Sequence, residues 1–159
     1  MILPGRAAAP AAEGPEARYR DALFTEGALD PFFAALADEV LVLAGTEDAV
    51  AFMRQVGRRL ASVMPLGPCD TLEALETAAN QALRGRRWGW VRLAEVEAGI
   101  RISHGALPVV VTIRTQSALA ALLEGLYSTW MHRAGGADHL QARHIAPGEA
   151  GTIDLLYGR

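Results

Sequence analysis

The sequence predicts an α+β protein in which N-terminal helices and one long helix in the C-terminal half pack on a roughly four-stranded, mostly antiparallel sheet. Large apolar residues recur every three or four positions across residues 30–85 and again across 117–135, as in amphipathic helices. Around these segments apolar and polar residues alternate, as in half-buried strands. We expect 1–28 to be a mobile tail rich in Ala and Pro, and 29–159 to form a single α+β domain.

Composition narrows the class of protein. The chain has 159 residues, of which 51% are hydrophobic and 21% charged, as in globular proteins. A net charge of −3 argues against a nucleic-acid partner, and a single cysteine, Cys69, excludes an intramolecular disulfide. No apolar run reaches the roughly 18–20 residues of a membrane span. The N-terminal residues lack the apolar core of a cleavable signal peptide, which favours the cytoplasm, with the periplasm as the alternative.

Two helices are expected before residue 65. Asp30 and Pro31 suit the start of the first, Gly45 its end, Thr46 the start of the second and Pro65 its end. The link between them is short enough for either a helical hairpin or a steep bend. The residues expected to be buried are Phe32, Phe33, Leu36, Val40 and Leu43 in the first helix, and Val50, Met53, Val56, Leu60 and Val63 in the second.

A third helix and two hairpins follow. Asp70 and Glu73 suggest a capping box, and the helix they open places Leu72, Leu75, Ala79 and Leu83 inward and ends at Gly85. The first hairpin joins Trp88–Val96 to Ile100–His104, and the second joins Asp138–Ile145 to Thr152–Tyr157. The β-branched stretch Val109–Ile113 is either a short strand or an extended lead-in to the next helix.

The long helix is predicted over Ser117–Gly135 and ends at Gly135-Gly136. Its apolar stripe consists of Leu119, Leu122, Leu123, Leu126 and Trp130. We expect this stripe, together with Phe32-Phe33 and the Trp88–Trp90 segment, to exceed what one protomer can cover. The sequence therefore predicts association of subunits, for which closed symmetric rings are the common form.

Motifs for catalysis or cofactor binding are lacking in the sequence. It contains no glycine-rich phosphate loop, no GxSxG and no HExxH. The four histidines do not have the spacing of a metal site, and we expect His104 to be an edge residue with its hydrogen bonds satisfied. We expect no cofactor and no metal.

Three kinds of residue leave a functional alternative open. Cys69 precedes a helix, which can activate a thiol, although a structural role is favoured. Glu124 lies in an apolar helix, where it is either a catalytic acid or, as we favour, a residue that faces a polar rim or bonds an indole N–H. The three tryptophans, Trp88, Trp90 and Trp130, suit packing better than stacking on sugar rings.

Several short motifs follow one another at near-constant spacing between Phe52 and Gly136. They are Phe52–Arg58, Met64-Pro65, Pro68-Cys69, Trp88-Gly89 with Val91 and Leu93, Arg101-Ile102 and His104 with Leu107-Pro108, and Leu123-Glu124-Gly125-Leu126-Tyr127 followed by Trp130. In this order they resemble the cellulose synthase operon protein D family, which belongs to bacterial cellulose synthase complexes. The N-terminal tail, 109–117 and the details of the C-terminal hairpin depart from that family.

The resemblance implies a non-catalytic accessory protein. It implies a ring-like homo-octamer, built as a tetramer of dimers, that assists export and crystalline bundling of β-1,4-glucan and has other synthase subunits and glucan chains as partners. A structural or interface role is implied for Met64, Pro65, Cys69, Trp88, Gly89, Leu107, Pro108, Glu124, Gly125, Leu126, Tyr127 and Trp130. No glucan-contacting residue follows from it, because the tail does not align.

Two functions of other classes are kept as alternatives. The first is a sensor that binds a small ligand, haem or lipid, in a pocket between the long helix and the sheet, with His104 or His132 facing the cavity. The second is an enzyme that uses Cys69 or Glu124.

Overall fold

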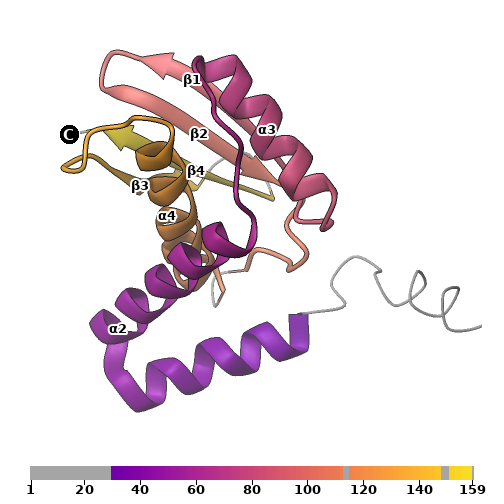
Figure 1. Ribbon diagram of the computed structural model, residues 1–159. Coiled ribbons are helices and arrows are strands. Elements are labelled where there is room, and N and C mark those ends of the chain that lie inside the picture. Colours follow the sequence, from indigo (N-terminus) through magenta and orange to yellow (C-terminus); the bar gives the residue numbers. More distant parts are fainter. Residues whose placement is uncertain (1–29, 113–114, 148–150, 159) are drawn as a thin grey trace, which may run out of the picture.

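The computed structural model describes residues 30–112, 115–147 and 151–158, so the predicted tail and Ile113 lie outside the described residues. Helices and an antiparallel sheet are arranged as the α+β prediction requires (Figure 1). In chain order the elements are α2 (Asp30–Val63), α3 (Leu72–Arg84), β1 (Trp90–Val96), β2 (Gly99–Gly105), α4 (Gln116–Arg133), β3 (Gln141–Pro147) and β4 (Thr152–Gly158).

The sheet has four strands in the order β1-β2-β4-β3, and every neighbouring pair is antiparallel. Both predicted hairpins form, and they meet through β2 and β4, where Ile102 lies opposite Leu155. His104 lies on β2, one of the two central strands, so its predicted place at an edge is wrong. Which strand is central depends on how the two hairpins pair, and these are distant in sequence. The alternation of apolar and polar residues within one strand does not indicate that pairing.

Residues 109–112 form no strand, which favours an extended lead-in to α4 over a strand. A hydrogen-bonded turn precedes the helix, with the Thr112 N–H donating to Thr115 Oγ1 at 3.0 Å. At the other end of α4, Gly135 has a φ of 97°, and the Gly136 N–H donates to Met131 O at 2.9 Å. This is the Schellman pattern that the glycine pair predicts.

α2 bends sharply at Gly45, whose φ of 74° and ψ of 174° are not helical (Figure 1). The predicted break is therefore confirmed, in the form of a bend. Phe33 and Met53 are buried as predicted, but the predicted burial of Phe32 and Val63 is wrong, since they are 69% and 58% exposed. Helical spacing places a residue on a face, but only the neighbouring elements decide how wide a strip of that face is covered.

The cap of α3 lies one residue later than the predicted Asp70. Thr71 has the extended backbone of an N-cap, and its hydroxyl accepts a hydrogen bond from the Ala74 N–H at 3.1 Å. Both residues have side chains that can cap, so composition alone did not separate them. The inward positions of this helix are confirmed for Leu75, Ala79 and Leu83.

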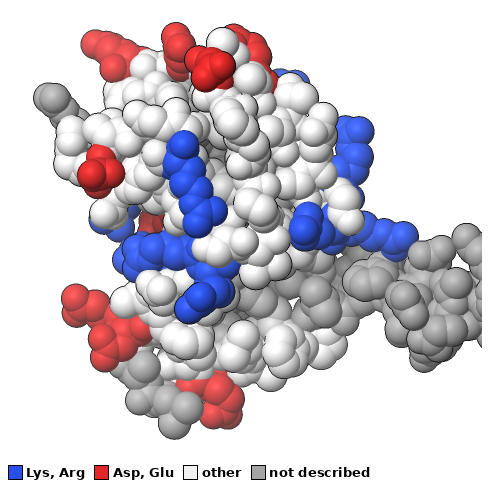
Figure 2. All heavy atoms as spheres, viewed as in Figure 1, with Lys and Arg blue, Asp and Glu red and all other residues white. Residues whose placement is uncertain are grey.

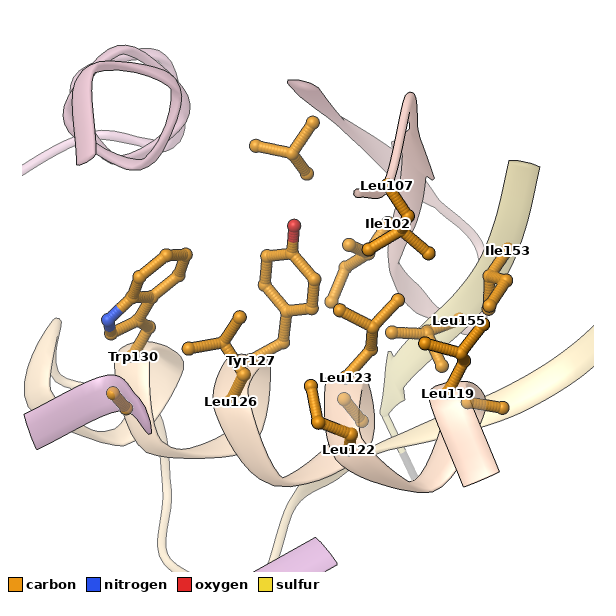
Figure 3. Close-up of a cluster of buried hydrophobic side chains, with 14 of the residues drawn as sticks. Ile102, Leu107, Leu119, Leu122, Leu123, Leu126, Tyr127, Trp130, Ile153 and Leu155 are labelled. Atoms are coloured by element: carbon orange, nitrogen blue, oxygen red, sulfur yellow. The ribbon is translucent and has the colours of Figure 1, made fainter. Parts of the chain in front are cut away.

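α4 lies between the sheet and α2, and Figure 3 shows Leu119 and Leu123 of α4 next to Ile153 and Leu155 of β4. The predicted stripe is fully buried: Leu119, Leu122, Leu123, Leu126 and Trp130 are at most 3% exposed. The remaining residues between 119 and 127 are buried as well. The expectation that one protomer cannot cover this helix is therefore wrong, because its own α2 covers the side that faces away from the sheet.

Two glycines allow α2 and α4 to cross with their backbones almost in contact. A Cβ atom on Gly57 would lie 1.8 Å from Leu122 O, and one on Gly125 would lie 1.9 Å from Arg54 O. Neither position tolerates a methyl group unless the helices separate. The crossing therefore fixes where Arg54 approaches α4.

Helix side chains close both outer edges of the sheet. At β1, the Asn80 side chain bonds the N–H and C=O of Val91 at 3.0 and 2.8 Å, and Glu76 accepts from the Leu93 N–H at 2.6 Å. At β3, hydrogen bonds of 2.9 Å join the Ala142 N–H to Ser128 Oγ and the His144 N–H to Glu124 Oε1. Helix residues four positions apart are separated by about 6 Å along the axis, and strand residues two positions apart by about 6.8 Å. Two helix side chains at positions i and i+4 can therefore bond two alternate amides of an edge strand.

Substitution of Gly125 by Ala should lower the free energy of unfolding by at least about 2 kcal/mol, because the added methyl group must push α2 from α4. Urea denaturation measures the change. Gly67→Ala is the matched control, since no atom lies within 4 Å of a Cβ at that position, and it should change stability by less than about 0.5 kcal/mol. Equal stability of the two variants would contradict the close crossing.

Candidate functional site

Glu124 is the centre of a buried ionic cluster that joins three elements. Glu124 is only 7% exposed. Arg54 of α2 donates two hydrogen bonds to Glu124 Oε2, from Nε at 2.9 Å and from Nη2 at 2.5 Å. Its other oxygen accepts the His144 N–H of β3. Arg143 Nη1 lies 3.8 Å from Oε2. Both carboxylate oxygens are thus engaged, as a buried charge requires.

The expectation that Glu124 bonds an indole N–H is wrong. The indole of Trp130 instead donates to Met64 O at 2.9 Å, which ties α4 to the end of α2. Arg54 is the residue that sequence reasoning missed. A signal was present, because a carboxylate inside an apolar helix needs a cation, and Arg54 follows a 24-residue stretch, 30–53, without any basic residue.

A second buried polar group is centred on His104. The Nε2 atom of His104 lies 2.9 Å from the carbonyl of Trp88, and its Nδ1 lies 2.6 Å from the Tyr127 hydroxyl. A carbonyl only accepts, so Nε2 carries the proton and Nδ1 accepts from the hydroxyl. Burial lowers the pKa of His104 to about 4 and raises the pKa of Tyr127 well above its usual value.

The aromatic rings continue this group along α4. Tyr127 meets the ring of His104 edge-on at 5.8 Å and the ring of Trp130 at 5.5 Å. Figure 3 shows Tyr127 and Trp130 projecting from the same side of the helix. The last part of the family-like motif, Glu124 to Trp130, therefore supplies side chains to both buried groups.

The remaining family-motif residues are placed in several environments. Met64, Leu107 and Leu126 are buried, Trp88, Cys69 and Pro108 are half-buried, and Pro65 is exposed. Gly89 has a φ of 86°, and a Cβ there would lie 2.0 Å from Gly105 O, so the position requires glycine. The Cys69 thiol donates to Gly67 O at 3.2 Å.

Neither histidine that the ligand-sensor alternative requires is poised for a ligand. His104 has both ring nitrogens engaged. His132 Nε2 lies 2.6 Å from Leu140 O, and its ring packs edge-on against Tyr157. Within the described ranges, no group of three or more His, Cys, Asp and Glu side chains is placed to hold a metal ion.

An open hollow of about 410 Å³ lies beside the ionic cluster. Its lining includes Glu124 and His144, and the Nε2 atom of His144 is buried and has no hydrogen-bond partner among the residues that the structure describes. The other lining residues are Val50, Gln116, Ser117, Ala120 and Ala121.

The fold and the two buried groups define an α+β protein in which buried polar side chains hold helix α4 to the strands. Glu124 bonds the edge strand β3, and Tyr127 bonds His104 of the central strand β2. The family model for the D-type subunit of cellulose synthase matches residues 19–158, and the chain belongs to this family of accessory proteins of bacterial cellulose synthesis. A cellulose synthase operon protein D of Komagataeibacter xylinus is 34% identical over 138 residues, covering 80% of this chain and 88% of the relative. One of Komagataeibacter sucrofermentans is 36% identical over 139 residues, with the same coverage. The resemblance is thereby confirmed.

Among the described residues, every helix is too short or too polar to cross a lipid bilayer.

Removal of Arg54 should lower the free energy of unfolding by up to about 3–5 kcal/mol, because Arg54→Ala removes two hydrogen bonds from the buried Glu124 carboxylate and leaves it with the exposed Arg143 at 3.8 Å. Arg92→Ala is the control. It removes an exposed arginine of β1 that pairs with no acidic residue in the described part of the chain, and it should change the free energy of unfolding by less than about 0.5 kcal/mol. Equal losses in the two variants, measured by urea denaturation, would argue against a buried ionic anchor.

The protein should lose stability as the pH falls from about 6.5 to about 4. The pKa of His104 is about 4 in the folded protein and about 6.5 when unfolded, so the unfolded chain takes up the proton first. The stability associated with neutral His104 is fully present above pH 6.5, and its loss amounts to about 3 kcal/mol once the pH reaches about 4.

Thermal unfolding at a series of pH values tests this dependence. His104→Gln should be less stable at neutral pH and should lack this part of the acid loss. His139→Gln, at an exposed position, should keep the wild-type profile. An unchanged slope in His104→Gln would refute the assignment.

Proposed function

We propose that this protein is a non-catalytic scaffold component of a bacterial cellulose synthase complex. As a ring-like homo-octamer, a tetramer of dimers, it assists export of β-1,4-glucan and its bundling into crystalline cellulose. Its partners are other subunits of the complex and the glucan chains, and its place is the cytoplasmic side of the membrane. The observation that carries the proposal is the match of residues 19–158 to the cellulose synthase family model.

The hydrogen bonds of the buried titratable groups support a scaffold rather than an enzyme. Glu124 is paired with Arg54 and a strand amide, and His104 is bonded to a carbonyl and to Tyr127. A general acid or base needs atoms that are free to meet a substrate, and here those atoms are already bonded to protein groups, although Glu124 also borders the open hollow. We propose that the family-motif residues act by holding α4 in place.

Exposed apolar residues support the assembly part of the proposal. Phe32, Val42, Phe52 and Val63 of α2 are each at least 48% exposed. Outside α2, Trp90, Val96, Val110 and Ile145 are exposed as well. These residues, rather than α4, provide the apolar surface that a partner would cover.

Light scattering on the purified full chain, after size exclusion, should give a mass of about eight protomers. Deletion of the gene should lower the yield and crystallinity of cellulose, and a copy that encodes Glu124→Gln with retained folding should restore at least part of both. A monomeric wild-type protein would overturn the octamer, and full cellulose output without the gene would overturn the accessory role.

A further inference from the structure

Charge is divided unevenly along α2. Between Asp30 and Met53 it carries five acidic residues and no basic one, whereas its last ten residues carry three arginines and no acid. All 15 basic residues of the chain are arginines, which bind carboxylates in a bidentate fork. The bend at Gly45 places part of the acidic stretch at an exposed corner, here called the acidic elbow, formed by Glu39, Glu47 and Asp48.

The basic counterpart surrounds the C-terminal end of α2. This basic belt consists of the exposed residues Arg58, Arg59, Arg86 and Arg133. Arg133 donates to Ala61 O at 3.1 Å and to Ser62 Oγ at 3.2 Å, and Arg86 donates to Val63 O at 3.4 Å. These arginines thus come from α2, from the loop after α3 and from α4. Figure 2 shows basic side chains gathered across the middle of this face, with acidic ones at its lower left, where α2 bends.

Neither surface is neutralised within the described part of the chain. The ion pairs described there are Arg54–Glu124, Arg101–Asp154 and Arg143–Glu124, and none involves a residue of the belt or the elbow. Asp48 and Arg58 are ten residues apart on one helix, or about 15 Å along its axis, which is too far for a direct pair. Elbow and belt can therefore pair with each other only between molecules.

Exposed apolar residues accompany both charged surfaces. Val42 and Phe52, near the elbow, are 79% and 48% exposed, and Val63, beside the belt, is 58% exposed. Apolar contact with a complementary charged rim is the usual anatomy of an interface.

We propose that the acidic elbow of one copy of this chain docks on the basic belt of the next copy. The inference rests on the proposed function, since it assigns the surfaces through which the scaffold assembles. Elbow and belt are different surfaces, so the contact is heterologous, and its repetition closes a ring when the rotation per subunit permits. The arginines set the specificity of the contact and the exposed apolar residues are buried by it.

The test uses charge reversal in the full-length protein. Glu47→Arg with Asp48→Arg reverses the elbow, and Arg58→Glu with Arg59→Glu reverses the belt. Each double variant alone should associate at least about tenfold more weakly than the wild type, as measured by analytical ultracentrifugation. An equimolar mixture of the two should recover the wild-type mass. Raising the salt from about 0.1 M to about 1 M should weaken the wild-type assembly.

Glu73→Arg with Glu97→Arg is the matched control, because it makes the same change in net charge as the elbow reversal, at exposed positions on α3 and the first hairpin. It should assemble like the wild type, and circular dichroism confirms that every variant folds. An oligomeric wild type that both reversals leave intact would overturn this interface but not the octamer. Disruption without recovery in the mixture would overturn the pairing of belt with elbow. A monomeric wild type would overturn both proposals.

Discussion

The pairing of the Glu124 carboxylate with Arg54 constrains the rest of this structure. A buried carboxylate is costly unless both of its oxygens accept hydrogen bonds. In Glu124 the two oxygens accept hydrogen bonds from opposite sides. Arg54 approaches from α2, and the His144 N–H approaches from the outer edge of β3. One side chain therefore fixes the position of α4 relative to both layers that cover it.

The glycine crossing and the ionic pair depend on each other. Gly57 and Gly125 bring the backbones of α2 and α4 together, so that Arg54 reaches Glu124 with two N–H groups. Once α2 is held there, it covers the outer side of α4, and the bend at Gly45 carries its first half away from the sheet. The same arrangement leaves charged and apolar residues of α2 exposed, and these are the surfaces through which we propose that the protein assembles.

Much of the fold could be predicted from local patterns. The glycines at 45, 85 and 135, the alternation around Val91 and Leu93, and the inward face of α3 all agree with the structure. The predictions that failed concern features set by contacts between segments that are distant in sequence. The central place of His104, the exposure of Phe32 and the partner of Glu124 follow from strand order and helix crossing, which local periodicity does not encode. Similarity to the operon protein D family identified the motif residues without indicating what they contact.

Native-state hydrogen exchange of the His144 amide tests most directly whether Glu124 anchors α4 to the sheet. An amide on the outer edge of an edge strand exchanges rapidly unless a partner covers it. We expect strong protection of this amide in the wild type, and loss of that protection when Glu124 is replaced by Ala in a variant that still folds. Rapid exchange in the wild-type protein would contradict the anchoring role of Glu124.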